Sequence, residues 1–142
     1  MTRNELLKFL RKQRHGVIAT VAPDGEPQAA LVGIAFTDQL ELIFDTVGTS
    51  RKWKNLKKHS RIAVVIGGFD GSEITVQLEG VADEPQGVEL DRLKEEYFKA
   101  YPDGRERQSW QGITYLRVKP KWIRYSDFNP NGAIVEFTEG EL

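Results

Sequence analysis

The sequence predicts a mainly β domain, in which six to seven short strands form an antiparallel sheet or barrel with helices on its flanks. Three observations predict this fold class. Short β-rich runs follow one another along the chain with turn residues between them. Some runs alternate apolar and polar residues, most clearly the run at 74–81. Neither a Gly-x-Gly-x-x-Gly nor a P-loop pattern, which would indicate a doubly wound parallel sheet, is present.

The first half of the chain alternates helices with candidate strands. Residues 2–13 place leucines at helical spacing among cations and predict a short amphipathic helix capped by Thr2 or Asn4. Turn residues at 23–25 separate two β-rich runs, which predicts a hairpin. The expected strands here are 16–21, 28–36 and 40–44, the last with one polar edge, and a helix is expected at 51–59.

The second half adds four strands and one helix to this pattern. The helix is expected at 88–101, where apolar residues recur at helical spacing before Pro102-Asp103-Gly104. Pro120 is expected to separate the last two strands. The expected strands are 62–66, 74–81, 113–118 and 122–126. With 142 residues, residues 1–142 are expected to form a single domain.

Composition excludes several kinds of site. The chain has no cysteine, so disulfides, thiolate metal ligands and a cysteine nucleophile are excluded. Its two histidines, His15 and His59, are too few and too isolated to predict a metal centre or a Ser-His-Asp triad. No apolar run approaches the roughly 20 residues of a membrane span, and the N-terminus is charged, so a cytoplasmic protein without a membrane partner is expected.

Charge is distributed unevenly along the chain. The net charge is −1, yet no Asp or Glu occurs between Asp45 and Asp70. The six cations in that interval leave the rest of the chain at −7. They are Arg51, Lys52, Lys54, Lys57, Lys58 and Arg61. This asymmetry indicates one local site for an anionic partner.

The helix expected at 51–59 begins with charges of the unfavourable sign. Helix N-termini carry partial positive charge and favour acidic residues, whereas this first turn holds Arg51, Lys52 and Lys54. Ser50 or Thr49 supplies a good cap. A bound phosphate would offset the unfavourable charges, because N–H groups, a cap hydroxyl and a guanidinium can all donate to it. A solvated basic helix explains the charge pattern equally well.

The run Phe44-Asp45-Thr46-Val47-Gly48-Thr49-Ser50-Arg51-Lys52 resembles the phosphate-binding stretch of the pyridoxamine 5′-phosphate oxidase superfamily, the FMN-binding split barrels. The resemblance continues upstream through 18–21 and 25–27, and downstream through Asn55-Leu56, 61–66, 80–81 and 118–120. It therefore covers most of residues 5–126. It implies a split β-barrel that binds FMN.

The resemblance also implies a set of cofactor-binding residues. Thr46, Ser50, Arg51 and Lys52 become ligands of the FMN phosphate, with Asp45 in the same stretch. Val32 and Gly33 lie in the strand that presents backbone groups to the isoalloxazine edge, where Gly33 allows close approach. Thr75 lies where relatives have a polar contact to the flavin. No catalytic residue and no metal ligand is implied.

Other features separate this chain from the vitamin-converting oxidases of that superfamily. Positions where those enzymes carry an Arg and a Lys are Ala30 and Ala35 here, and the segment 134–142 is acidic rather than basic. Such an end would repel a phosphorylated substrate. The chain is thus similar to the branch called general stress proteins, and the resemblance implies a homodimer with flavin at its interface.

Three functions are compatible with the sequence. The first is an FMN-dependent oxidoreductase that uses NAD(P)H or a small-molecule redox substrate, with the redox step on the flavin. The second is a non-catalytic flavin-binding or stress protein, and the third, ranked lowest, is nucleic-acid recognition by the basic helix. A deazaflavin or heme stays open as the cofactor. Trp53 and Leu56 are expected to pack in the core, and Trp110 to form a dimer contact or, second, a flavin contact.

Overall fold

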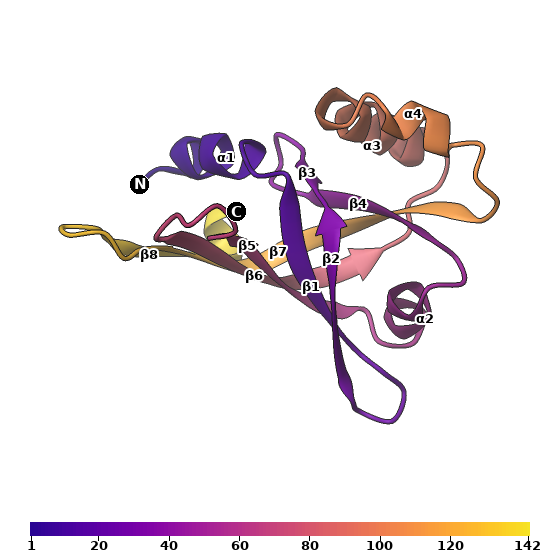
Figure 1. Ribbon diagram of the computed structural model, residues 1–142, viewed down its shortest axis with the longest axis horizontal. Helices are drawn as coiled ribbons and strands as arrows, with labels where there is room; N and C mark the ends of the chain where they lie inside the picture. Colours follow the sequence, from indigo (N-terminus) through magenta and orange to yellow (C-terminus); the bar gives the residue numbers. More distant parts are fainter.

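A computed structural model describes residues 1–142 and shows a curled antiparallel sheet with four helices around it (Figure 1). The helices are α1 (Arg3–Arg11), α2 (Arg51–Lys58), α3 (Gly87–Ala100) and α4 (Gly104–Arg107), and a 3₁₀ turn η1 (Glu139–Glu141) ends the chain. The strands are β1 (His15–Val21), β2 (Pro27–Gly33), β3 (Ala35–Phe36), β4 (Leu42–Val47), β5 (Arg61–Gly67), β6 (Ile74–Asp83), β7 (Ile113–Asp127) and β8 (Ile134–Thr138). The predicted fold class is confirmed.

The sheet runs in the order β2-β1-β5-β6-β7-β4-β3, and β8 pairs with β7 off this path. Only Ile34 separates β2 from β3, although the two strands lie at opposite ends of the path. The sheet therefore curls until β2 packs beside β4 without strand pairing between them. This unpaired seam between β2 and β4 is called the split from here on.

Two apolar clusters hold the elements together. The larger lies inside the curled sheet and is closed by Leu6 and Leu10 of α1 and Leu56 of α2. The smaller packs Leu93, Tyr97 and other side chains of α3 against the outer side of β3, β4 and β7. Because β4 lies between the clusters, its residues Leu42 to Phe44 are all buried rather than alternating.

Four expectations about the strands need correction. The run expected at 28–36 is broken at Ile34 into β2 and β3, because the backbone there crosses from one end of the sheet to the other. The strand expected at 40–44 begins at Leu42, since Leu40 has a φ of 60°, and Glu41 is buried rather than a polar edge. β8 and α4 were not expected, so the sheet has eight strands.

The fourth correction concerns the end of the chain, where β7 is one continuous strand through Pro120. A register shift between Glu79 and Gly80 accommodates the proline. A Cβ at position 80 would collide with the Lys119 carbonyl oxygen, so glycine is required at this bulge. The helices expected at 2–13, 51–59 and 88–101 are confirmed to within two residues at each end.

Candidate functional site

The split exposes the backbone of one strand edge. The N–H of Ile34 donates to the Arg14 carbonyl, and that of Ala22 donates to the Glu26 carbonyl. Antiparallel pairs alternate between bonded and non-bonded positions, so in the β1–β2 register the even-numbered residues of β2 face β1. The backbone groups of Leu31 and Gly33 therefore point away from β1, toward the split. They can pair with a ligand as they would with another strand.

A hollow of about 280 Å³ opens along the split. It is lined by Leu31, Val32, Gly33, Asp45, Thr46, Val47, Lys52, Arg107, Trp110 and Ile113. The sequence-predicted residues Val32, Gly33, Asp45, Thr46 and Lys52 thus lie in one hollow. Neighbouring β4 and α2 bring the last two together, while β2 supplies the opposite wall.

The start of α2 faces this hollow with unused donors. The Thr46 hydroxyl donates to Ser50 Oγ at 2.9 Å, and Ser50 Oγ accepts the Trp53 N–H at 3.2 Å as the helix cap. The Ser50 hydroxyl proton is therefore left for another acceptor. The N–H groups of Arg51 and Lys52, in the first turn, have no partner within the helix or among the loop bonds.

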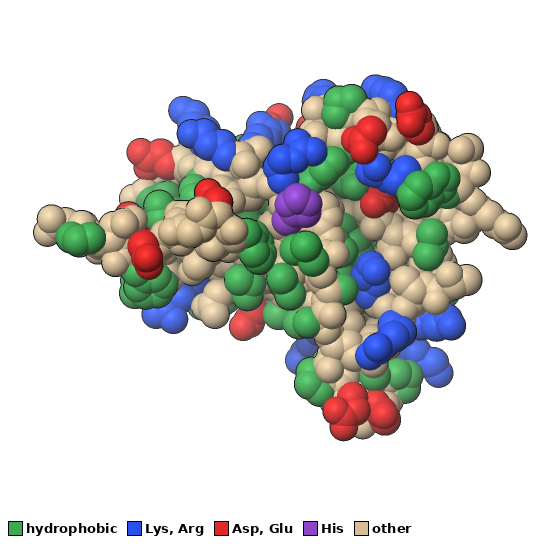
Figure 2. Space-filling view, in the orientation of Figure 1, with side chains coloured by type: hydrophobic (Ala, Val, Ile, Leu, Met, Phe, Trp, Pro, Cys, Tyr) green, Lys and Arg blue, Asp and Glu red, His purple; other side chains and the backbone are tan.

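Arg51 and Lys52 form no ion pair with any acidic side chain. Arg51 Nε donates to Gln28 Oε1 at 3.0 Å, and Lys52 lines both the split and a second hollow of about 230 Å³ that also holds Arg51 and Ala30. Figure 2 shows Lys and Arg side chains gathered over α2, to the right of the β1–β2 hairpin. The donor set suits a phosphate, which accepts from hydroxyl, amide, ammonium and guanidinium groups together.

Asp45 is already occupied by a partner within the chain. Arg107 Nε donates to its carboxylate at 2.9 Å, and the hydrogen bond to Asp45 is the main cause of the raised pKa of Arg107. Arg107 also contacts Asp103 at 2.9 Å and the Tyr97 hydroxyl at 3.4 Å. Asp45 and Arg107 therefore neutralise one another at the wall of the hollow.

Two phenols lie behind that ion pair. Burial raises the pKa of Tyr97, and the nearby Asp45 carboxylate raises it further. Burial likewise raises the pKa of Tyr115, whose buried hydroxyl has no hydrogen-bond partner in the structure. Both side chains stay protonated at neutral pH and pack the ion pair from the side of α3.

Three residues named from the sequence have neighbours that it did not indicate. A Cβ on Gly33 would lie 3.0 Å from the Tyr101 ring, so Tyr101 packs closely against the face of Gly33 that a side chain would occupy. Thr75 pairs with Ser126 near one end of β7, whereas Thr46 pairs with Thr114 near the other. The structure does not bring Thr75 to the hollow of the same chain. Ala35 also lies elsewhere, buried beside α3.

Sequence reasoning missed several residues around the hollow. Arg107 contacts Asp45 from 62 positions away, and Gln28 contacts Arg51 from 23 positions away. The buried Asn55 supports Gln28 from the core. No local spacing pattern reports contacts over such separations. Trp110 is 57% exposed at the mouth of the hollow, and Trp53 packs partly buried against the core while Leu56 is buried.

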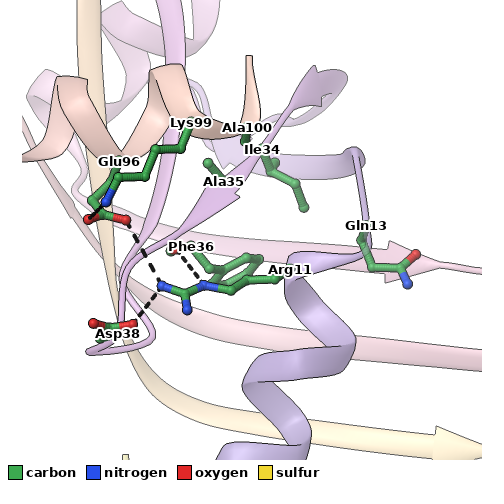
Figure 3. A pocket seen from close by; sticks show the side chains of 9 residues that line it. All are labelled: Arg11, Gln13, Ile34, Ala35, Phe36, Asp38, Glu96, Lys99 and Ala100. Atoms are coloured by element: carbon green, nitrogen blue, oxygen red, sulfur yellow. Dashed lines mark hydrogen bonds and ion pairs between the residues drawn. The ribbon is translucent and has the colours of Figure 1, made fainter. Parts of the chain in front are cut away.

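A third hollow, of about 330 Å³, lies between α1, β3 and α3 and has a different character (Figure 3). Arg11 pairs with Asp38 at 2.7 Å and reaches Glu96 at 4.0 Å, and Lys99 pairs with Glu96 at 2.9 Å. Its two cations and two acids are thus matched within the chain. None of the predicted cofactor-binding residues lines it.

Neither a cluster of metal-ligating side chains nor a membrane-spanning helix is present. No group of three or more His, Cys, Asp or Glu side chains is arranged to hold a metal ion. None of the helices combines the length and the apolar character that crossing a membrane requires.

Comparison with curated proteins gives partial matches. A pyridoxine/pyridoxamine 5′-phosphate oxidase from Burkholderia lata is 32% identical over 93 residues, which is 66% of this chain and 41% of that protein. A 5a,11a-dehydrotetracycline/5a,11a-dehydrooxytetracycline reductase from Streptomyces rimosus is 33% identical over 63 residues, 42% of this chain and 44% of that protein. The chain thus spans less than half the length of these relatives.

Solved structures share the fold at lower identity. A heme binding protein from Mycobacterium smegmatis has a TM-score of 0.78 at 18% identity, covering 91% of this chain and 54% of that one. General Stress Protein 26 from Bacillus anthracis has a TM-score of 0.69 at 20% identity, covering 96% of this chain and 100% of that one. An FMN binding protein from Nostoc punctiforme has a TM-score of 0.75 at 12% identity, covering 99% of this chain and 93% of that one. These likenesses establish the fold.

A sequence model of one family decides the classification. It is the model described as pyridoxamine 5′-phosphate oxidase, and it matches residues 2–127, which include the split, α2 and all three hollows. The predicted resemblance to this family is thereby confirmed. The chain belongs to the pyridoxamine 5′-phosphate oxidase family.

Proposed function

We propose that this protein binds FMN, with the phosphate at the start of α2 and the isoalloxazine in the split. The observation that carries the proposal is the unmatched pair of cations Arg51 and Lys52 beside unused hydroxyl and N–H donors. A phosphate dianion supplies the missing negative charge there. Thr46 and Ser50 then orient its oxygens.

The walls of the split favour a flavin over a heme. The backbone edge at Leu31 and Gly33 offers donors and acceptors in one row, as the pyrimidine edge of a flavin requires. None of the lining residues is a His, Cys, Met or Tyr, the usual axial ligands of heme iron. A deazaflavin with a phosphate would meet the same donors, so titration of the apo-protein with it, beside FMN, distinguishes the two cofactors.

We infer that the protein is an oxidoreductase whose redox step the flavin performs. FMN accepts and delivers a hydride or single electrons when bound, while the protein binds and orients it. The Asp45–Arg107 pair and the protonated phenols behind it hold the wall in place without supplying a free acid or base. The curated relatives named as an oxidase and a reductase support this class of reaction.

We do not propose pyridoxamine 5′-phosphate as the substrate. Ala30 lines the 230 Å³ hollow beside Arg51 and Lys52 with only a methyl group, where the vitamin oxidases are expected to carry an arginine. Instead, NADH, NADPH or another small redox molecule is the proposed partner. If anaerobic mixing with either nucleotide fails to bleach the bound flavin, a non-catalytic flavin-binding role replaces this proposal.

A second copy of the chain is the proposed partner at the outer face of β2, β1 and β5. Leu31, Val17 and Val65 lie side by side in register on that face, and Leu31 and Val65 are 62% and 43% exposed. An apolar row of this kind is typical of an interface core. A molar mass of one chain by light scattering would contradict the dimer.

The phosphate assignment is tested by titrating the apo-protein with FMN and with riboflavin, read by quenching of flavin fluorescence. Arg51→Ala/Lys52→Ala is expected to weaken FMN binding on the order of 100-fold or more, because two charge-assisted bonds of about 1.5–3 kcal/mol each are lost. Riboflavin binding should change little. Lys54→Ala/Lys58→Ala removes the same charge from exposed positions of α2 and is the matched control. Equal FMN affinity in both double variants would contradict the assignment.

A further inference from the structure

The side-chain amide of Gln28 joins three elements behind the start of α2. Its Oε1 accepts from Arg51 Nε at 3.0 Å and from Asn55 Nδ2 at 2.8 Å. Asn55 Nδ2 also donates to Thr20 Oγ1 at 3.0 Å. β1, β2 and α2 are thereby connected through one carbonyl oxygen and one amino group.

The inner part of this chain of bonds is anchored in the core. Asn55 is 4% exposed and Thr20 is 3% exposed, so neither side chain has room to move. Both amide protons of Asn55 and both lone pairs of Gln28 Oε1 are used. Arg51 is exposed, and its bond to Gln28 is its single protein contact through a side-chain donor.

Holding Arg51 by Nε leaves its two terminal nitrogens without protein acceptors. These are the groups that form a two-pronged contact with phosphate oxygens. An unrestrained arginine would have to give up rotamer freedom on binding, whereas an arginine already held loses less. The holding group is neutral, so it does not compete with an anion for the guanidinium charge, as a carboxylate at position 28 would.

We propose that Gln28, fixed by Asn55, is a positioning residue that presents Arg51 to the phosphate of a flavin nucleotide. The inference rests on the proposed FMN site and adds a residue from β2 to it. Gln28 then affects the preference for FMN over riboflavin and has no part in binding the ring. Gln28 lines the same 230 Å³ hollow as Arg51 and Lys52.

The test is a double-mutant cycle between Gln28 and Arg51, measured as the ratio of riboflavin to FMN dissociation constants. Gln28→Met keeps the side-chain length and removes the acceptor, and it is expected to lower the ratio about 5- to 10-fold through FMN alone. In an Arg51→Ala background it should have no further effect. Gln28→Glu should lower FMN binding further than Gln28→Met, since its charge pairs with Arg51 and repels phosphate. Gln39→Met, at an exposed turn, is the control.

The outcomes separate the two proposals. A lowered ratio in Arg51→Ala with an unchanged ratio in both Gln28 variants overturns the positioning role and leaves the FMN site standing. The same holds if Gln28→Met lowers the ratio equally in the presence and absence of Arg51. An unchanged ratio in Arg51→Ala itself overturns the phosphate site and the positioning role together. If Gln28→Met fails to fold, Gln28→Glu tests the positioning role in its place, because it retains an acceptor for Asn55.

Discussion

The hollow in Figure 3 and the split differ in how their charges are matched. In the first, Arg11 and Lys99 face Asp38 and Glu96, and each charge has an opposite charge within 4.0 Å. In the split and the hollow beside it, Lys52 and Arg51 have no acid, although both lie in the unfavourable field of a helix N-terminus.

Whether a charged hollow is a candidate ligand site depends on the charges that the fold leaves unmatched. A matched set connects elements, as Arg11 connects α1 to the turn before β4. An unmatched set at a helix N-terminus lowers the stability of the fold and is where an anionic ligand is proposed to bind. Arg117, the most deeply buried cation, also belongs to a matched set. It forms ion pairs with Glu41, Asp83 and Glu89, and these four residues are called the Arg117 cluster.

The largest expected effect on stability comes from breaking that matched cluster. Arg117 and Glu41 are 7% and 5% exposed, so Arg117→Met leaves the buried Glu41 carboxylate with only Arg92 as a cation and should lower the free energy of unfolding by about 3 kcal/mol. Urea unfolding followed by circular dichroism measures it. Arg11→Met breaks an exposed pair and should cost less than about 1 kcal/mol. Equal losses in the two variants would contradict the ranking by burial.

Filling the unmatched site should stabilise the protein nearly as much. FMN at 100 times its dissociation constant is expected to raise the free energy of unfolding by about 2.7 kcal/mol, since it binds only the folded chain. At the same FMN concentration, a variant with 100-fold weaker binding gains only about 0.4 kcal/mol. Arg51→Ala/Lys52→Ala is that variant, and thermal unfolding with and without FMN measures the difference. Equal stabilisation of both proteins would show that FMN binds elsewhere.

The sequence predicted the elements of the site better than the site itself. The cap at Ser50, the cations after it and Thr46 before it are close in the chain, so their spacing reports their geometry. The β-rich runs likewise predicted the sheet. The break at Ile34 did not follow from the residues, because the curling of the whole sheet decides where β2 ends.

Long-range partners account for what the sequence left out. The sequence places Asp45 in the predicted phosphate-binding stretch, and the structure adds that Arg107, distant in the chain, donates to its carboxylate. The sequence indicates that Gly33 allows close approach of a ligand, and the structure adds that Tyr101 packs beside it. Both contacts depend on α3 packing against β3 and β4, which tertiary structure alone reveals.

A smaller effect is expected from Glu89, the exposed member of the Arg117 cluster. Hydrogen bonds from Arg92 and then Arg117 lower the pKa of Glu89 from 4.5 to about 2. Because the folded pKa is the lower one, the contribution of Glu89 to stability is complete above pH 4.5 and is lost as the pH falls through about 2. Glu89→Gln should therefore be less stable than the natural chain near pH 6, and the difference should shrink toward pH 2 and vanish below it. A difference that stays the same between pH 6 and pH 2 would exclude this linkage. The effect is smaller than for Arg117, since the Glu89 side chain is 52% exposed.

The smallest effect has the opposite sign and tests the unmatched cations most directly. Lys52→Gln removes a cation from the first turn of α2 and should raise the stability of the apo-protein by about 0.3–1 kcal/mol, because the helix N-terminus is itself positive. Lys58→Gln, in the last turn of the same helix, should lower stability by a similar amount and is the matched control. Both differences should shrink in 1 M NaCl, where the Debye length is about 3 Å. A loss of stability in Lys52→Gln would mean that the fold itself uses this cation, and the contrast with the hollow of Figure 3 would then fail.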